Sequence, residues 1–229
     1  MTAPTPTPAT GSPVYCSGPM FSAGDLWEQQ AEATSHEGAG YTTYLPQRDG
    51  IEVGRVMALL NHPLLEGPIA DWVMAHVRRF VFALDMYQLL ERCQSLVFNL
   101  DGRVPDDGSV VETAAAFTAG KPLVIYKTTP ITMLAGTDNP MINGLAPGWS
   151  YVNDVAKLPA ALGAAIATTN GHASAYTAPA NVAAQITLGG KVWDVVEDLR
   201  GKPTDTDEGL LAWIAAFAKE MEAQPAAVA

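Results

Sequence analysis

The sequence predicts an α/β protein built on a doubly wound parallel sheet with helices on both faces. Two compact apolar runs, 95–100 and 122–126, have the composition of buried strands. An alanine-rich helix is expected between them over 109–119, ended by Gly120. A strand, a helix and a second strand in this order require parallel pairing and a right-handed crossover. Repetition of such units produces a sheet that helices cover on both sides.

The N-terminal part predicts a tail, a strand and a helix. Residues 1–12 are expected to be disordered because alternating prolines oppose both helix and sheet, and they lack the apolar core of a signal peptide. Residues 14–16 are expected to form the first strand. Ser22 and Asp25 have the spacing of a capping box, which predicts a helix that continues to about Thr34.

The middle of the chain contains the strongest helix signal. Residues 41–45 are rich in β-forming side chains and end at Pro46, which predicts a second strand. Residues 49–67 hold several glycines and prolines and are interpreted as an insertion with a short helical piece. From 69 to 93, apolar residues recur at the 3.6-residue period of an amphipathic helix.

The remaining residues are expected to complete a single domain over 13–229 that ends in a helical extension. Residues 168–181 are predicted to be a loop, residues 191–199 suit a strand or a helix, and 207–221 are typical of an amphipathic helix. A length of 229 residues with 48% hydrophobic content fits one decorated domain with a sizeable core.

Composition excludes several classes of partner. The formal net charge is −11, with no cluster of lysine or arginine, so neither nucleic acid nor an anionic membrane is an expected partner. The longest quasi-apolar run, 158–167, is too short to span a bilayer. Two cysteines and four histidines without metal-ligand spacing predict no disulfide framework and no metal site. These features together favour a cytoplasmic protein.

The candidate site lies where the strands end, because ligands of parallel sheets bind at the carboxyl edge. Residues 15–21, 46–49 and 101–112 would converge there. Glu112 has two interpretations. With Ser109 it has the spacing of a capping box, the commoner arrangement. Alternatively, the helix dipole keeps it ionised beside apolar neighbours, which makes it a candidate nucleophile.

Four other side chains also have two interpretations. Asp106 and Asp107 form either an ordinary acidic turn or a pair in which one carboxyl stays protonated as a general acid. Tyr15 is either a core tyrosine or a hydroxyl donor to a catalytic carboxylate. Asp85 lies on an apolar helix face, where it is either functional or paired in a salt bridge with Arg78, Arg79 or Arg92.

Four segments together resemble the nucleoside 2-deoxyribosyltransferases. They are Val-Tyr-Cys-Ser-Gly-Pro-Met-Phe at 14–21, Tyr-Leu-Pro-Gln at 44–47, Asp-Asp-Gly-Ser-Val-Val-Glu at 106–112 and Gly-Lys-Pro at 120–122. Their order and separation match the family over roughly residues 13–145. The resemblance implies a flavodoxin-like sheet and exchange of the base on a 2′-deoxynucleoside.

The resemblance also implies catalytic roles. Glu112 looks like the nucleophile, and Tyr15 looks like the hydroxyl that holds and tunes it. Asp106 and Asp85 resemble the acidic residues that contact base or sugar, one of them acting as proton donor to the leaving base. The implied reaction is a retaining double displacement through a covalent glycosyl-Glu112 intermediate, with no cofactor or metal.

The implied binding residues come from the same segments. Gln47 resembles the glutamine that binds the base, Phe21 resembles the aromatic wall of the sugar site, and Gly18 belongs to the same first segment. Asn143 looks like the asparagine that family members lend to a neighbouring subunit's site. The expected partners are therefore 2′-deoxynucleosides, free purine or pyrimidine bases, and further copies of the chain in a homo-oligomer with shared active sites.

Two other functions are compatible with the sequence. The nearest is a nucleoside or nucleotide N-glycosidase, in which water replaces the acceptor base. The other is a flavodoxin-like binding or signalling module. The segment 16–20 lacks the acidic residues of a phosphoacceptor and offers little of the phosphate loop of a flavin carrier, which disfavours that module.

Overall fold

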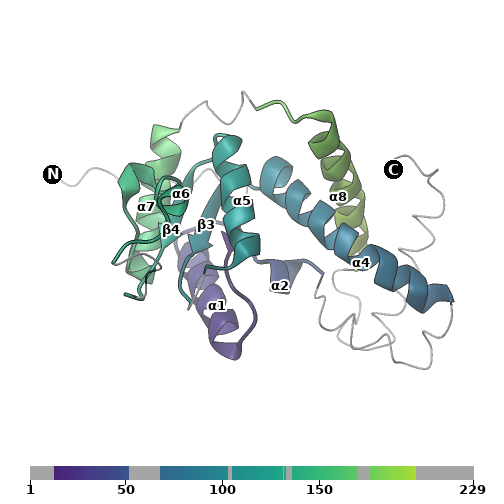
Figure 1. Cartoon of the computed structure of the whole chain (residues 1–229), viewed down its shortest axis with the longest axis horizontal. Helices are drawn as coiled ribbons and strands as arrows, with labels where there is room; N and C mark the ends of the chain where they lie inside the picture. The colour runs from purple at the N-terminus through teal and green to yellow at the C-terminus, as the bar shows by residue number, and fades with distance from the viewer. Residues whose placement is uncertain are drawn as a thin grey trace. The chain divides into compact units, whose positions relative to one another are not determined.

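The computed structural model describes residues 13–51, 68–102, 105–130, 132, 136–169 and 176–199. The chain divides into two compact units (Figure 1). The first contains Met1–Asp49 and Gln88–Pro179, and the second contains Gly50–Tyr87 and Ala180–Ala229. The predicted tail at 1–12, most of the predicted insertion and the predicted helix at 207–221 lie outside the described residues.

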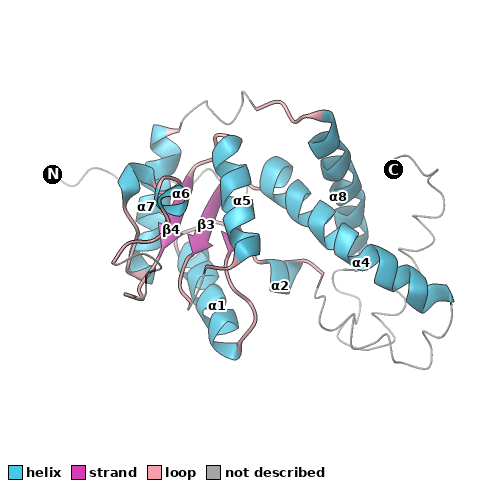
Figure 2. Cartoon of the chain, in the orientation of Figure 1, coloured by secondary structure: helices cyan, strands magenta, loops and turns pink. Residues whose placement is uncertain are grey.

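The first unit has an α/β fold around a four-stranded sheet in which every pair of neighbours is parallel (Figure 2). The strand order is β2-β1-β3-β4. The strands are β1 (Val14–Ser17), β2 (Thr43–Tyr44), β3 (Ser95–Asn99) and β4 (Leu123–Tyr126). Beyond β4, Val152 adds one parallel bridge to Tyr126. The three apolar runs at 14–16, 95–100 and 122–126 therefore form strands, as predicted.

Helices cover both faces of this sheet. On one face, helix α7 (Leu158–Thr168) packs Leu158 and Leu162 against the buried valines Val14, Val97 and Val124. Helix α1 (Ala23–Gly38) covers the same face, where its Ala33 contacts Cys16. Helix α5 (Asp107–Thr118) lies on the opposite face, because successive strand residues point to opposite sides and α5 bonds the alternate residues of β1.

The start of α1 was predicted correctly. Ser22 is its N-cap, and Asp25 completes the capping box by accepting from the Ser22 backbone N–H at 2.8 Å. The helix ends at Gly38 rather than near Thr34. The next residue that strongly opposes a helix after Thr34 is Gly38 itself, so the extension follows from local propensity.

Short elements complete the first unit. They are α2 (Pro46–Asp49), the π-helical turn η2 (Gln88–Arg92), α6 (Pro140–Asn143) and the 3₁₀ turns η3 (Pro147–Trp149) and η4 (Val155–Lys157). In η2 the Cys93 N–H donates to the Gln88 carbonyl five residues earlier, which ends the α-helical pattern. The predicted helix over 69–93 is therefore α-helical only as far as Tyr87.

The second unit contains two long helices in contact, α4 (Pro68–Tyr87) and α8 (Ala180–Leu199). Their close approach requires Gly189, since a Cβ atom there would lie 2.0 Å from the Ala83 carbonyl oxygen. Helix α8 begins eleven residues before Lys191, so the segment 191–199, for which the sequence suits a strand or a helix, is helical. The predicted loop ends before Ala180. No helix in the described ranges is long and apolar enough to cross a membrane.

Candidate active site

Glu112 on α5 is held by two hydroxyl groups of β1. The Tyr15 hydroxyl donates to Glu112 Oε1 at 2.9 Å, and the Ser17 hydroxyl donates to Oε2 at 2.5 Å. Tyr15 and Ser17 are two residues apart on one strand, so both side chains point to the face that α5 covers. Each carboxylate oxygen therefore has its own donor from the sheet.

The expected capping box between Ser109 and Glu112 is wrong. Asp106 is the N-cap of α5, and its Oδ2 accepts from the Ser109 N–H at 2.7 Å and from the Ser109 hydroxyl at 2.6 Å. The helix starts two residues earlier than predicted, at Asp107, so Ser109 already lies in the first turn. An aspartate satisfies the free N–H groups there, which leaves the Glu112 carboxylate to bond β1.

A cavity of about 230 Å³ opens beside Glu112. It brings together four of the residues predicted from sequence, which are Gly18, Phe21, Asp106 and Glu112. Its remaining lining residues are Met20, Pro46, Asp107, Gly108 and Ser109. Its size is just below the ~300–1,000 Å³ range of typical small-molecule sites. All of these residues belong to the first unit, and they come from the carboxyl end of β1, the start of α2, and the N-cap and N-terminal half of α5.

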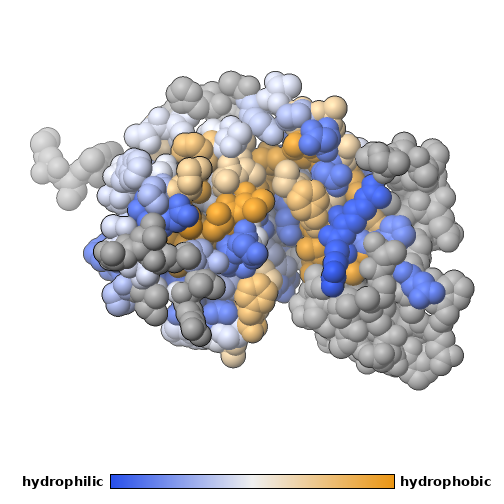
Figure 3. Space-filling view, in the orientation of Figure 1, coloured by the Kyte–Doolittle hydropathy of each residue, from blue (hydrophilic) through white to orange (hydrophobic). Residues whose placement is uncertain are grey.

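Large apolar side chains are exposed at the cavity rim and on α5. Phe21 at the cavity rim is 81% exposed, so it is available to contact a ligand. On α5, Val111 and Phe117 are also exposed, and the surface in Figure 3 shows apolar residues around this helix. The mouth of the cavity therefore combines an aromatic side chain with the carboxylates of Asp106 and Asp107.

The pKa of Glu112 is higher than expected for a carboxylate that the helix dipole keeps ionised. Burial raises the pKa of Glu112 to about 7. The hydrogen bonds from Ser17 and Tyr15 lower this pKa, and the nearby Asp106 carboxylate raises it further. Burial is the largest of these effects, so the net result is a pKa above the ordinary value.

Gly18 has a steric role at the edge of this site. A Cβ atom at Gly18 would lie 1.6 Å from Gln29 Nε2 and 2.9 Å from Asn99 Cβ. Gln29 belongs to α1, so Gly18 lets the helix on the opposite face of the sheet approach the end of β1. Glu32 on the same helix accepts from Asn99 Nδ2 at 2.6 Å, and burial raises its pKa well above the ordinary value.

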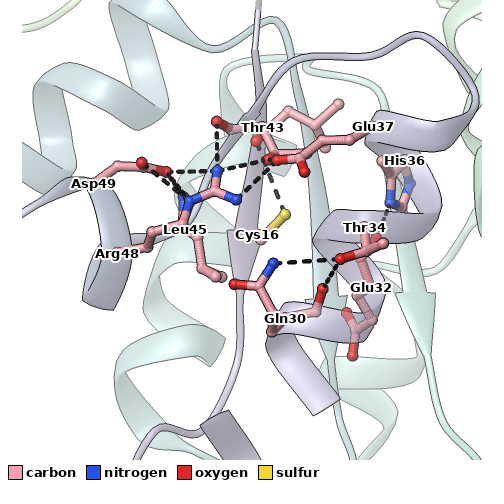
Figure 4. A network of polar contacts seen from close by, with 11 residues as sticks. Cys16, Gln30, Glu32, Thr34, His36, Glu37, Thr43, Leu45, Arg48 and Asp49 are labelled. Atoms are coloured by element: carbon pink, nitrogen blue, oxygen red, sulfur yellow. Dashed lines mark hydrogen bonds and ion pairs between the residues drawn. The ribbon is translucent and has the colours of Figure 1, made fainter. Parts of the chain in front are cut away.

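Gln47 belongs to the short helix α2. Arg48 of the same helix ties α2 to its neighbours through hydrogen bonds and ion pairs (Figure 4). The Arg48 guanidinium donates to Glu37 Oε1 and to Asp49 Oδ2, each at 2.9 Å, and to Thr43 Oγ1 at 3.0 Å. Neither the amide oxygen nor the amide nitrogen of Gln47 has a hydrogen-bond partner within the described part of the chain, although both are buried. A ligand amide or ring nitrogen would satisfy them.

Three predicted site residues, Gln47, Asp85 and Asn143, are not among the residues that line the cavity beside Glu112. Asp85 lies on α4 in the second unit and is partly exposed. Asn143 ends α6, where its Nδ2 donates to the Asp138 carbonyl at 3.2 Å and its Oδ1 accepts from the Tyr151 hydroxyl. Asp138 in turn forms a buried ion pair with Lys127 at 2.6 Å. The Asn143 amide is thus engaged within its own chain.

Ser17 is the functional candidate that the sequence interpretation missed. Its position two residues after Tyr15 would have identified it, since alternation on a strand places the two side chains together. Within the described ranges, no group of three or more His, Cys, Asp or Glu side chains is arranged to hold a metal ion. No protein-family model and no curated protein sequence matches the chain.

Proposed function

We propose that the protein transfers the 2-deoxyribosyl group between nucleobases, with Glu112 as the nucleophile. The observation that carries the proposal is the geometry of Glu112. Its carboxylate lines a cavity and is fixed by the hydroxyl groups of Tyr15 and Ser17 instead of capping its own helix. A capping carboxylate would instead bond the free N–H groups of its own helix. The resemblance of the four sequence segments to nucleoside 2-deoxyribosyltransferases supports the choice of reaction.

The strand order supports the same family. The order β2-β1-β3-β4 is compatible with a flavodoxin-like sheet, in which ligands bind at the carboxyl ends of the central strands. Glu112, Gly18 and Asp106 lie at that edge of β1 and at the start of α5. The polar residues that a nucleoside would contact thus come from the loops that follow β1, β2 and β3.

The proposed reaction has two displacements. The Glu112 carboxylate attacks C1′ of the deoxyribose, the C1′–N bond breaks, and its electron pair leaves with the base. The Asp106 carboxyl, in its protonated form, gives the departing base its proton. A second base then attacks C1′ of the glycosyl ester from the opposite side. The carboxylate leaves, the proton of the incoming nitrogen returns to the acid, and the β configuration is retained.

Phe21, Gln47, Tyr15 and Ser17 each have a role in this proposal. Phe21 packs against the sugar, and Gln47 bonds the edge of the base through its unsatisfied amide. Tyr15 and Ser17 hold the carboxylate in the orientation needed for attack on C1′. Because the pKa of Glu112 is about 7, the ionised nucleophile is present in a substantial fraction at neutral pH.

The test uses 2′-deoxyadenosine as donor and a second free base as acceptor. We expect a new deoxynucleoside by chromatography and, without acceptor, a deoxyribosyl adduct on the intact protein by mass spectrometry. Glu112→Ala should abolish both. Glu91→Gln, at an exposed carboxylate of η2, is the matched control and should change neither. Full activity of Glu112→Ala together with no adduct on the wild-type protein would exclude the mechanism.

The same assay separates transfer from hydrolysis. A glycosidase would release free deoxyribose at one rate whether or not an acceptor base is present. A transferase forms the new nucleoside in proportion to the acceptor, with parallel lines in a double-reciprocal analysis of donor against acceptor. Retention of the β configuration in the product, measured by proton NMR, further requires two displacements rather than one.

A further inference from the structure

Ser17 occupies a position that is set by the sheet rather than by a loop. It is the last residue of β1, pairs with Phe98 of β3 and is 1% exposed. Its hydroxyl proton is directed at Glu112 Oε2 at 2.5 Å, across 95 residues of sequence. Serine hydroxyls next to a turn often bond backbone groups that are close in sequence. Here the hydroxyl is committed to one carboxylate.

Two donors restrain a carboxylate more than one donor does. With Tyr15 alone, the Glu112 carboxylate could rotate about its last side-chain bond and still keep one hydrogen bond. The second donor, on the second oxygen, removes that freedom. Both donors belong to one rigid strand, so the carboxylate plane is fixed relative to the cavity that Glu112 lines.

We propose that Ser17 is a positioning residue for Glu112: its hydroxyl orients the carboxylate toward the cavity and favours its ionised form. This inference rests on the proposed role of Glu112 as nucleophile. Ser17 itself is not expected to touch the substrate, because its side chain is buried behind the carboxylate and is absent from the cavity lining.

The charges around Glu112 show why a second donor matters. The titratable groups that face it are Tyr15 on β1 and Asp106 before α5, and Asp107 lines the same cavity. Burial and Asp106 both disfavour the ionised carboxylate. The hydroxyl groups of Ser17 and Tyr15 favour it, and the contribution of Ser17 is the larger. Loss of the Ser17 hydroxyl should therefore raise the pKa of Glu112 more than loss of the Tyr15 hydroxyl.

The first test compares the pH dependence of kcat/KM for deoxyribosyl transfer in Ser17→Ala and wild-type protein. A hydrogen bond to a charged group typically moves a pKa by about one to two pH units. We therefore expect the acid limb of Ser17→Ala to move upward by that amount, with activity at pH 7 lower by about 5- to 50-fold. Much of the loss should be recovered at pH 9.5, where Glu112 is ionised in both proteins.

The matched control is Ser95→Ala. Ser95 is also a buried serine of the same sheet, but it begins β3 and its side chain points to the face opposite Glu112. Its pH profile should superimpose on that of the wild-type protein. If Ser17→Ala instead loses the same fraction of activity at every pH, Ser17 has only a packing role and the inference is overturned.

A second measurement needs neither substrate nor the alanine variant. The pKa of the Glu112 carboxyl is measured by NMR titration of its carboxyl carbon in the wild-type protein and in Ser17→Cys. The cysteine replaces the serine hydroxyl with a weak donor of similar size. We expect a higher pKa in Ser17→Cys, and an unchanged pKa would overturn the inference. If the wild-type protein transfers no deoxyribose, the proposed function fails, and this titration still decides whether Ser17 controls the ionisation of Glu112.

Discussion

Replacing Glu112 with glutamine is expected to stabilise the fold at alkaline pH, although the same change should abolish transfer. The reason is the cost of ionising a partly buried carboxyl. The pKa of Glu112 is about 7 in the folded protein, against an ordinary value of 4.5. The folded state therefore binds its proton more tightly than the unfolded state does. Stability is lost as the pH rises from about 4.5 through 7 and is then constant.

The size of the effect follows from the same difference. A gap of about 2.5 pKa units corresponds to about 3 kcal/mol of destabilisation above pH 8. At pH 5 the same linkage amounts to less than about 1 kcal/mol. Glutamine keeps one acceptor and gains one donor for Tyr15 and Ser17, and it never ionises. Since solvent in the cavity screens the charge, about 3 kcal/mol is an upper bound.

The assay is thermal unfolding of wild-type and Glu112→Gln protein at pH 5 and pH 8. For a chain of this length, about 3 kcal/mol corresponds to roughly 6–12 °C in Tm. We expect the variant to gain Tm by up to that amount at pH 8 and to differ little at pH 5. Glu91→Gln, at an exposed carboxylate, should show no such dependence on pH. Equal differences at the two pH values would refute the claim that burial governs the ionisation of Glu112.

Two further predictions follow from the helix ends and the helix contact. Asp106→Asn should keep the N-cap of α5, since asparagine caps as well as aspartate, but should lower the pKa of Glu112 by removing a nearby charge. NMR titration of the Glu112 carboxyl measures this, and a rise would contradict it. Gly189→Ala should destabilise the protein by about 1–3 kcal/mol, because the new methyl would overlap the Ala83 carbonyl oxygen. Gly190→Ala, where the nearest atom is 3.4 Å away, should be neutral or stabilising by up to about 1 kcal/mol in a denaturation experiment.

The strands of the first unit could be predicted because their signals are local. The runs that became β1, β3 and β4 are apolar throughout, and buried parallel strands need no other pattern. The capping box at Ser22 could be predicted for the same reason, since both of its partners lie within one turn.

The first half of α8 could not be predicted, because its cause is tertiary. The adjacent glycines Gly189 and Gly190 oppose a helix by intrinsic propensity. In the structure they lie inside α8, and Gly189 is needed for contact with Ala83 of α4. A glycine weakens an isolated helix, but it can be required where two helices touch. Sequence periodicity does not distinguish a glycine that ends a helix from one that lies at a helix contact.

The start of α5 was mispredicted because two capping patterns overlap in one segment. Asp106 and Ser109 have the spacing of one cap, and Ser109 and Glu112 have the spacing of another. Local propensity alone does not choose between them. Tyr15 and Ser17 compete for Glu112 from β1, and they are brought to it only by the folded sheet. The resemblance pointed to Glu112 and Tyr15 as site residues. It did not show that Asp106, rather than Ser109 with Glu112, caps α5, which leaves the Glu112 carboxylate able to bond β1.

The register of β1 links the core to the candidate site. Val14 and Cys16 point to one face, where they contact α7 and α1, and Tyr15 and Ser17 point to the other, where they bond Glu112. A slip of one residue would exchange the two sets, which would bury two hydroxyl groups in the apolar core and leave Glu112 facing a valine and a thiol. The apolar packing of Val14 and Cys16 therefore selects the one register in which both carboxylate oxygens receive a donor. Substitutions on the core face of β1 should affect the ionisation of Glu112 only where they disturb that register.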